Sequence, residues 1–217
     1  VYVPASSAND WKEFLAKPDR QWKAGYSAHA LAHAWQEADG FPESVRRVLA
    51  KSGRFTSIEL LLAIPEHQVA LPGGRTPSQS DLWVLARTDS GLVSMAVEGK
   101  VAEPFGPTVQ DWLSDASSGK RKRLKFIRSL LELEGMEIGP IRYQLLHRTA
   151  SAVLEAPRFH AVQSMMMVHS FSAQDEGFDD YRDFVSLFGA AAELNEVTNA
   201  GAVSGTELFF AWVRGSE

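Results

Sequence analysis

The sequence contains no cysteine, which excludes disulfide bridges and thiolate metal sites. It also has no apolar run long enough to cross a bilayer, so we expect no membrane contact. The first ten residues lack the basic and apolar segments of a signal peptide, and we therefore expect a cytoplasmic protein. What is present is typical of a globular chain: 217 residues, 45% hydrophobic and 23% charged, which can bury a core as one domain.

The net charge is small, −5, which argues against a protein that coats nucleic acid through its overall field. The charge is unevenly distributed, because residues 173–217 hold nine acids and two bases whereas residues 1–172 are slightly basic. One stretch, 119–128, holds six bases and no acid. It is either a phosphate contact or, as we favour, a solvated face balanced by the acidic tail. The six bases are Lys120, Arg121, Lys122, Arg123, Lys125 and Arg128.

Helical and extended patterns alternate along the chain. Helical signals fill residues 1–55, and a strand meander follows, in which a turn at 89–91 joins two apolar strands into a hairpin. Residues 58–64 are apolar apart from Glu59 and fit either a helix or a strand. The expected helices are 10–16, 27–38, 42–51, 109–113, 119–134, 141–156 and 181–188, and the expected strands are 68–71, 82–86, 92–101, 161–171 and 208–213.

This order of elements fits an α/β or an α+β fold with one mixed sheet, and we expect the α/β class, in which helices flank a mixed central sheet. We expect a single domain over residues 1–217, since no repeat, low-complexity tract or linker interrupts the chain. Within it we distinguish a helical N-terminal segment (1–55), a core (56–172) and an acidic C-terminal helix and strand (173–217).

The second strand of the hairpin ends in Glu98-Gly99-Lys100. Strand side chains alternate, so Glu98 and Lys100 project from the same face. Charges at the end of a buried strand are costly unless they are paired or bind a ligand. Asp81 begins the preceding strand, so the hairpin should bring two acids and one lysine into a small volume.

Two close carboxylates repel each other, and a cation relieves that repulsion. Mg²⁺ fits such a site, with Mn²⁺ as an alternative, because it prefers oxygen ligands and often takes one or two carboxylates plus substrate phosphate. We expect Asp81, Glu98 and the Gly99 carbonyl to hold it, and Lys100 to orient or help deprotonate the attacking water. The competing interpretation is a solvated pair at a strand end, with Asp81 capping a turn.

Ser80-Asp81 followed by Glu98-Gly99-Lys100 resembles the PD-(D/E)XK nuclease superfamily, with Ser80 in place of the motif's proline. The strings at 71–74, 78–81, 98–100 and 142–148 also resemble an uncharacterised bacterial domain family with this fold. The resemblance covers about half of the chain and implies a restriction-endonuclease-like core in which Asp81, Glu98 and Lys100 are catalytic. It further implies a metal-binding acid on an upstream helix, for which we take Glu59, with Glu66 as the alternative.

Other polar side chains are weaker candidates, each with a structural alternative. Residues of the helix after Glu98-Gly99-Lys100 share faces at spacings of three and four, which suits substrate positioning as well as a solvent-facing surface. His29 and His33 have a zinc-binding spacing, but Ala30 stands where a zincin has glutamate, so we favour a structural role. The substrate-binding candidates are Gln79, in the loop before Asp81, and Arg142, Gln144 and His147 on the helix.

Three functions are compatible with these patterns. The first is a Mg²⁺-dependent nuclease whose partner is nucleic acid, DNA before RNA. The second is a nuclease-like module that binds nucleic acid or protein without cutting, and the third is a hydrolase of a small phosphate ester. A homodimer would suit the first, because nucleases that act on duplexes often pair two sites, although no coiled-coil pattern supports one.

Overall fold

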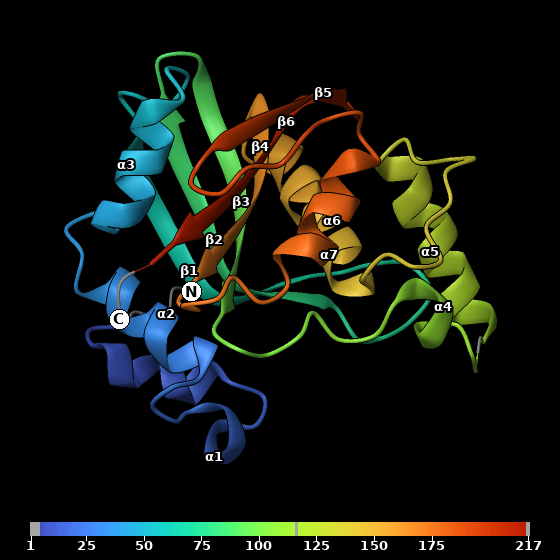
Figure 1. Cartoon of the computed structure of the whole chain (residues 1–217), viewed down its shortest axis with the longest axis horizontal. Coiled ribbons are helices and arrows are strands. Elements are labelled where there is room, and N and C mark those ends of the chain that lie inside the picture. The colour runs from blue at the N-terminus through green and yellow to red at the C-terminus, as the bar shows by residue number, and fades with distance from the viewer. Residues whose placement is uncertain (1–4, 116, 216–217) are drawn as a thin grey trace.

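A six-stranded mixed sheet crosses the protein, as seen in a computed structural model that describes residues 5–115 and 117–215 (Figure 1). The strands lie in the order β1-β2-β3-β4-β6-β5. The first three form an antiparallel meander, β4 is parallel to both β3 and β6, and β5 is antiparallel to β6. The strands are β1 (Glu59–Val69), β2 (Ser78–Thr88), β3 (Gly91–Lys100), β4 (Gln163–Ser170), β5 (Val197–Val203) and β6 (Thr206–Arg214).

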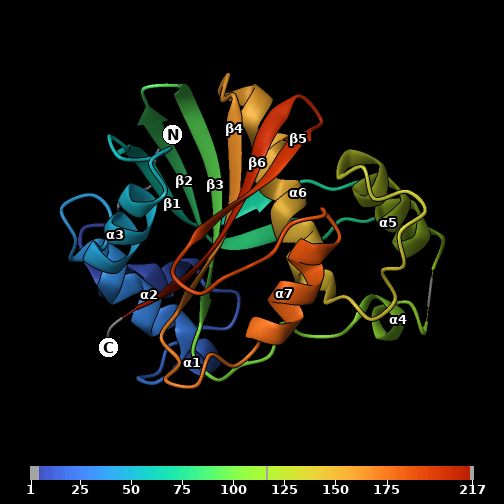
Figure 2. The ribbon, with the colours of Figure 1, turned by 45° about the horizontal axis from the view of Figure 1, so that its top comes forward.

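Helices cover both faces of the sheet, with α2 and α3 on one side and α6 and α7 on the other (Figure 2). Side chains of β4 alternate between these layers, since Met165 and Met167 pack with α2 and α3 whereas Met166 and Val168 pack with α6 and α7. The helices are the 3-10 helix η1 (Ala8–Phe14), α1 (Pro18–Gln21), α2 (Ser27–Gln36), α3 (Glu43–Lys51), α4 (Val109–Trp112), α5 (Ser118–Leu130), α6 (Tyr143–Arg158) and α7 (Phe178–Ser186).

The expected α/β class, with helices flanking one mixed sheet, is therefore confirmed. The ambiguous segment 58–64 belongs to β1, an edge strand that pairs with β2 along nearly its whole length. The expectation that Glu59 and Glu66 lie on an upstream helix is consequently wrong. Within the described ranges, no helix is both long and apolar enough to cross a bilayer.

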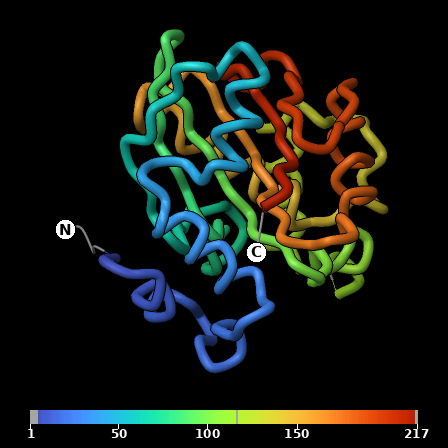
Figure 3. The backbone as a smooth tube through the Cα atoms, turned by 60° about the vertical axis from the view of Figure 1, so that its left-hand side comes forward, coloured from blue at the N-terminus to red at the C-terminus, as the bar shows by residue number. Residues whose placement is uncertain are grey.

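Residues 5–26 lie at one end of the molecule, as the dark blue tube shows (Figure 3). They lead into α2, whose start approaches the end of β3. A Cβ at Gly99 would lie 3.3 Å from both the Leu31 Cβ and the Ser27 carbonyl oxygen, so glycine permits this close contact. The helix α6 crosses the opposite face, and its first two turns lie over β2 and β3.

The loop between β1 and β2 packs tightly against the start of α5. Gly73 has a φ of +88°, and a Cβ there would lie 2.1 Å from the Gly119 carbonyl oxygen. An added side chain would therefore have to displace backbone atoms.

We expect Gly73→Ala to lower the free energy of unfolding by roughly 2 kcal/mol or more, because a left-handed conformation costs an L-residue about 1–2 kcal/mol and the backbone overlap adds to it. Gly25→Ala is a matched control, since its φ is +84° and nothing lies within 4 Å of an added Cβ. Urea denaturation followed by circular dichroism measures both losses. Equal losses in the two variants would contradict the packing described for Gly73.

Candidate functional site

Asp81, Glu98 and Lys100 lie together where β2 begins and β3 ends. Leu82 pairs with Val97, so Asp81 and Glu98 occupy the next opposed positions on the two strands. The Gly99 amide donates a hydrogen bond to Asp81 Oδ2 at 2.9 Å, and Lys100 Nζ lies 3.0 Å from Glu98 Oε1. The spatial convergence expected from the hairpin is present, whereas the roles of these residues in binding a cation stay a prediction.

Both oxygens of the Glu98 carboxylate are engaged. Oε1 accepts hydrogen bonds from Lys100 Nζ and from Gln144 Nε2, the latter at 2.6 Å. Oε2 accepts from Arg148 Nε at 2.6 Å. Burial opposes ionisation of Glu98, but the charges of Arg148 and Lys100 outweigh it and lower the pKa to about 2. Glu98 is therefore a buried, ionised and fully hydrogen-bonded carboxylate.

Asp81 is in a different electrostatic position. Burial and the Glu98 charge raise its pKa to about 7, against the opposing effects of Arg148, Lys100 and the Gly99 amide. The nearest cation, the Arg148 guanidinium, is 3.7 Å from Asp81 Oδ1 and is hydrogen-bonded to Glu98 instead. Asp81 thus lacks a cation of its own.

Glu66 is the third acid of the cluster. It lies between the pairs Pro65–Leu82 and His67–Ser80, which places it across from Asp81. Its φ of +53° is unusual inside a strand, and strained backbone of this kind is found often at functional sites. Gln79 Nε2 donates to Glu66 Oε2 at 2.5 Å. Burial and the Asp81 charge raise the Glu66 pKa to about 8.

Glu59 lies away from this cluster, and its assignment to the metal is wrong. It pairs with Arg87 at the other end of β1, where its side chain is 56% exposed. Positions 59 and 66 are seven residues apart, which corresponds to roughly 23 Å along a strand but only about 10 Å along one face of a helix. The two acids were equivalent candidates only while the segment could be helical.

The charges of the cluster fit a divalent cation. Three carboxylates face two cations, and burial together with repulsion from the neighbouring acid raises the pKa values of Asp81 and Glu66. Among the described residues, no group of three or more His, Cys, Asp or Glu side chains is arranged to hold a metal ion. Mg²⁺ does not require one, since it often binds through one or two carboxylates with water and substrate phosphate as further ligands. The Gly99 carbonyl contact stays a prediction.

The cluster opens to solvent through a cavity of about 510 Å³. The side chains of Asp81, Glu66 and Arg148 line it, and Lys100 does not. The Lys100 ammonium lies behind Glu98, 4.7 Å from the centre of the Phe105 ring. Residues of the N-terminal segment form the opposite wall; they include Leu15, Arg20, Gln21, Tyr26 and Ser27.

The structure separates the four predicted substrate-binding residues. Gln79 and Gln144 line the cavity beside the carboxylates. Arg142 does not line this cavity, and its guanidinium pairs with Asp180 at 2.9 Å; its assignment to substrate stays a prediction. His147 lines a different pocket, on the other side of α6.

Arg148 and the N-terminal wall were not among the predicted site residues. The position of Arg148, four residues after Gln144 on the same helix face, was the available signal for it. No local pattern marked residues 15–28, because their place beside the site depends on how the N-terminal segment packs.

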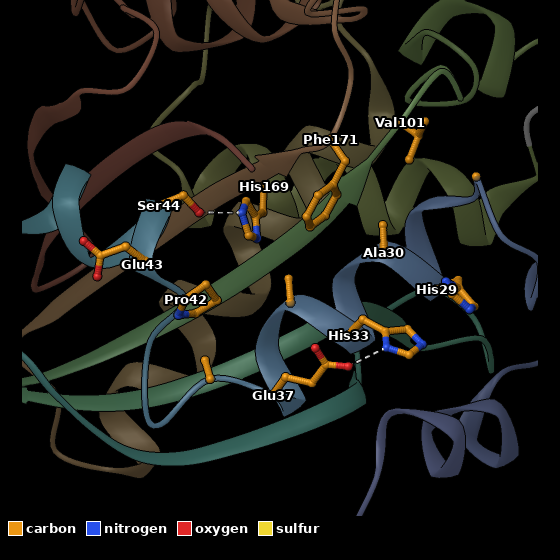
Figure 4. A pocket seen from close by; sticks show the side chains of 13 residues that line it. His29, Ala30, His33, Glu37, Pro42, Glu43, Ser44, Val101, His169 and Phe171 are labelled. Carbon is orange, nitrogen blue, oxygen red and sulfur yellow. Dashed lines mark hydrogen bonds and ion pairs between the residues drawn. The ribbon is translucent and has the colours of Figure 1, made fainter. Parts of the chain in front are cut away.

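Another pocket, of about 690 Å³, lies between α2, α3 and the end of β4 (Figure 4). His29 and His33 stack at 4.4 Å between ring centres, and His33 Nδ1 is 2.8 Å from Glu37 Oε1. Burial and the neighbouring His33 lower the His29 pKa. The structural role favoured for the two histidines stays a prediction.

The same pocket holds a Ser44–His169 pair that resembles a nucleophile and its base. Trp35 Nε1, which can only donate, hydrogen-bonds to His169 Nδ1 at 3.1 Å. The neutral ring therefore carries its proton on Nε2, and this N–H donates a hydrogen bond to Ser44 Oγ, 3.1 Å away. Burial lowers the His169 pKa to about 3. His169 is thus a buried core histidine whose two ring nitrogens are both hydrogen-bonded.

Comparison with known families gives one result. A family model described as "Domain of unknown function (DUF6946)" matches residues 4–217. No curated protein and no solved structure matches the chain.

The raised pKa values make stability depend on pH in a defined direction. Between about pH 4 and pH 8, the folded protein holds more protons on Asp81 and Glu66 than the unfolded chain does, so stability should fall as pH rises. We expect Asp81→Asn to reduce this loss between pH 5 and pH 8 by roughly 1–3 kcal/mol. Urea denaturation at the two pH values, with EDTA present, measures the difference.

Glu59→Gln is the control for this measurement, because its exposed carboxylate lies outside the cluster. It should change the pH dependence by less than about 0.5 kcal/mol. If Asp81→Asn lost as much stability as the wild type between pH 5 and pH 8, the proposed electrostatics of the cluster would be incorrect.

Proposed function

The chain belongs to the DUF6946 family, and we propose that it is a Mg²⁺-dependent nuclease that hydrolyses phosphodiester bonds, with DNA as the expected substrate. The observation that carries the proposal is the meeting of Asp81, Glu98 and Lys100 from adjacent strands beside an open cavity. Use of Mn²⁺ in place of Mg²⁺, and a cytoplasmic location, belong to the same proposal.

The excess of carboxylate in the cavity supports a divalent cation as the missing partner. Asp81 and Glu66 would hold it, with Glu98 as the neighbouring carboxylate. A cation bound there supplies Lewis-acid polarisation of the scissile phosphate and of the attacking water. It would also let Asp81 and Glu66 lose their protons at neutral pH, because the added positive charge lowers both pKa values.

The remaining side chains have assignable tasks in phosphodiester hydrolysis. Water adds to phosphorus while the bond to the leaving oxygen breaks, and that oxygen takes up a proton. Arg148 lines the cavity and can offset the negative charge that develops on the phosphate oxygens. Gln144 bonds both Glu98 and Lys100, so it keeps the carboxylate and the ammonium in a fixed relation. Lys100 is then available to phosphate or water if Glu98 turns toward the cation.

One observation favours a second function, a nuclease-like module that binds without cutting. Arg148, Lys100 and Gln144 already occupy both Glu98 oxygens, and Lys100 is 5% exposed. In such a module the Arg148 guanidinium takes the place of the cation permanently. The two functions require the same fold. They differ in whether the Glu98 carboxylate can leave its contacts with Arg148, Lys100 and Gln144 to bind a cation.

Cleavage assays with the purified protein test these alternatives. We expect cleavage of DNA with Mg²⁺ or Mn²⁺, and a loss of about 100-fold or more in Asp81→Asn and in Lys100→Met, because each removes a charge needed at the reacting phosphate. Glu59→Gln should keep the wild-type rate. Circular dichroism melts of each variant separate lost activity from lost folding.

Other outcomes assign the function elsewhere. A folded Lys100→Met variant that cuts at the wild-type rate would contradict the mechanism. Binding of DNA or RNA without cleavage would assign the non-catalytic module. Hydrolysis of bis(p-nitrophenyl) phosphate with no cleavage of DNA or RNA would assign a small phosphate ester as the substrate.

A further inference from the structure

A second pocket, of about 390 Å³, lies beside the carboxylate cavity. The start of α5, the loop between β1 and β2, and the end of α4 form its walls, next to α6 (Figure 1). Lys120 and Arg123 line it, and its described lining includes no acid. The carboxylate cavity on the other side of α6 has the opposite charge character, since four acids line it.

The two pockets share the walls that separate them. On α6, Tyr143 and His147 face the second pocket, whereas the adjacent residues Gln144 and Arg148 face the carboxylates. On β2, Ser78 lines the second pocket and the following residue, Gln79, lines the cavity. A ligand that occupies both pockets would therefore pass over the first turns of α6.

The cations of the second pocket are held in place by backbone carbonyls. Arg123 donates to the carbonyls of Pro72, at 3.1 Å, and Thr76, at 2.7 Å. Lys120 donates to the Trp112 carbonyl at 2.7 Å and pairs with the exposed Asp115. Carbonyl partners fix Arg123 without cancelling its charge, whereas the exposed Asp115 partly offsets the charge of Lys120.

The neutral groups in the pocket are arranged to donate hydrogen bonds. His147 Nδ1 lies 2.8 Å from Ser78 Oγ and 3.4 Å from Arg148 NH1. Because the arginine can only donate, Nδ1 is an acceptor and the ring proton is on Nε2. Burial and the Arg148 charge lower the His147 pKa well below its usual value, so the ring is neutral. His147 can thus supply an N–H donor without charge.

Tyr143 provides the observation that points most directly to a ligand. The residue is 8% exposed, its ring stacks on Trp112 at 3.9 Å, and it lines the pocket. Its hydroxyl is buried, and its neighbour Arg123 can only donate a hydrogen bond, so among the described residues the hydroxyl proton has no acceptor. Burial raises the Tyr143 pKa, and the charge and hydrogen bond of Arg123 only partly oppose the rise. A buried O–H donor without an acceptor is costly, and an anionic oxygen would satisfy it.

We propose that this second pocket binds a phosphate of a nucleic-acid strand, next to the phosphate that lies at Asp81 and Glu98. The inference rests on the proposed function, because it takes the carboxylate cavity as the place of hydrolysis. The ligand is a phosphodiester oxygen pair, held by the Tyr143 hydroxyl, the His147 N–H and the charges of Lys120 and Arg123. The exposed bases of α5 that follow, Lys122 and Lys125, extend the positive surface along the strand's path.

Fluorescence anisotropy of a labelled oligonucleotide tests the pocket separately from catalysis, using full-length Asp81→Asn with EDTA as the parent protein. When the Tyr143→Phe substitution is combined with Asp81→Asn, binding of the oligonucleotide should weaken about 3- to 10-fold. Added Lys120→Gln should weaken it similarly and reduce the slope of log K against log salt by roughly 0.7–0.9, as expected for one lost phosphate contact. Lys51→Gln, which removes an exposed charge on α3, should change neither quantity.

The outcomes distinguish this inference from the proposed function. If oligonucleotide binding depends on Tyr143 and Lys120 while the wild-type protein cuts neither DNA nor RNA, the pocket is supported and the nuclease proposal is contradicted. Cleavage by the wild type together with unchanged affinity in both pocket variants would overturn the pocket and leave the nuclease intact. A thermal shift assay with inorganic phosphate tests whether free phosphate is the ligand. If phosphate raises the melting temperature, Tyr143→Phe abolishes that rise and oligonucleotide affinity is unchanged in the variant, the ligand is free phosphate. That result would overturn the assignment of the pocket to a nucleic-acid strand.

Discussion

The buried contact between Glu98 and Arg148 organises the whole site. Two opposite charges are taken out of water here, and such a pair is tolerable only when its geometry is good and the remaining polar atoms are satisfied. Both conditions hold, since Arg148 Nε is 2.6 Å from Glu98 and the other carboxylate oxygen receives Lys100 and Gln144. The contact ties α6 to the end of β3 and thereby sets what each neighbouring acid can meet.

As a consequence, the three acids of the cluster differ in how closely they contact a cation. Glu98 takes the favourable contacts of both cations, whereas Asp81 and Glu66 on the solvent side are left with raised pKa values. An arrangement that only served stability would pair these acids or replace them with apolar residues. Retaining carboxylates with raised pKa values in a solvent-accessible cavity is characteristic of sites that bind a cation or exchange protons. The α6 helix then separates this acidic cavity from the basic pocket around Lys120, so one ligand can meet both.

The sequence was sufficient for the part of the site that depends on local geometry. Strand alternation and one turn determine that Glu98, Lys100 and Asp81 meet, and neither requires knowledge of the rest of the fold. Glu66 could not be chosen over Glu59 by such reasoning, because residues 60–64 are apolar at every position and show neither a helical nor a strand period. Pairing with β2 decides the matter, and that pairing is a tertiary event.

Other features depended on packing in the same way. The approach of Arg148 to Glu98 follows from the rotation of α6 on its core, which Leu145, Leu146 and Ala150 determine. The strand β5 was missed because its glycine and small residues have low strand propensity, and it forms by pairing with β6 around a register shift at positions 199–201. The restriction-endonuclease-like identity of the core stays a prediction from sequence resemblance.

The central claim is that the cluster lacks one positive charge and takes it from a divalent cation. Isothermal titration calorimetry with Mn²⁺ at pH 6.5, in two buffers of different ionisation enthalpy, measures that directly. The account predicts one bound ion per chain and release of protons from Asp81 and Glu66, with both signals lost in Asp81→Asn. Absence of binding by the folded wild type, or binding without proton release that survives Asp81→Asn, would contradict it.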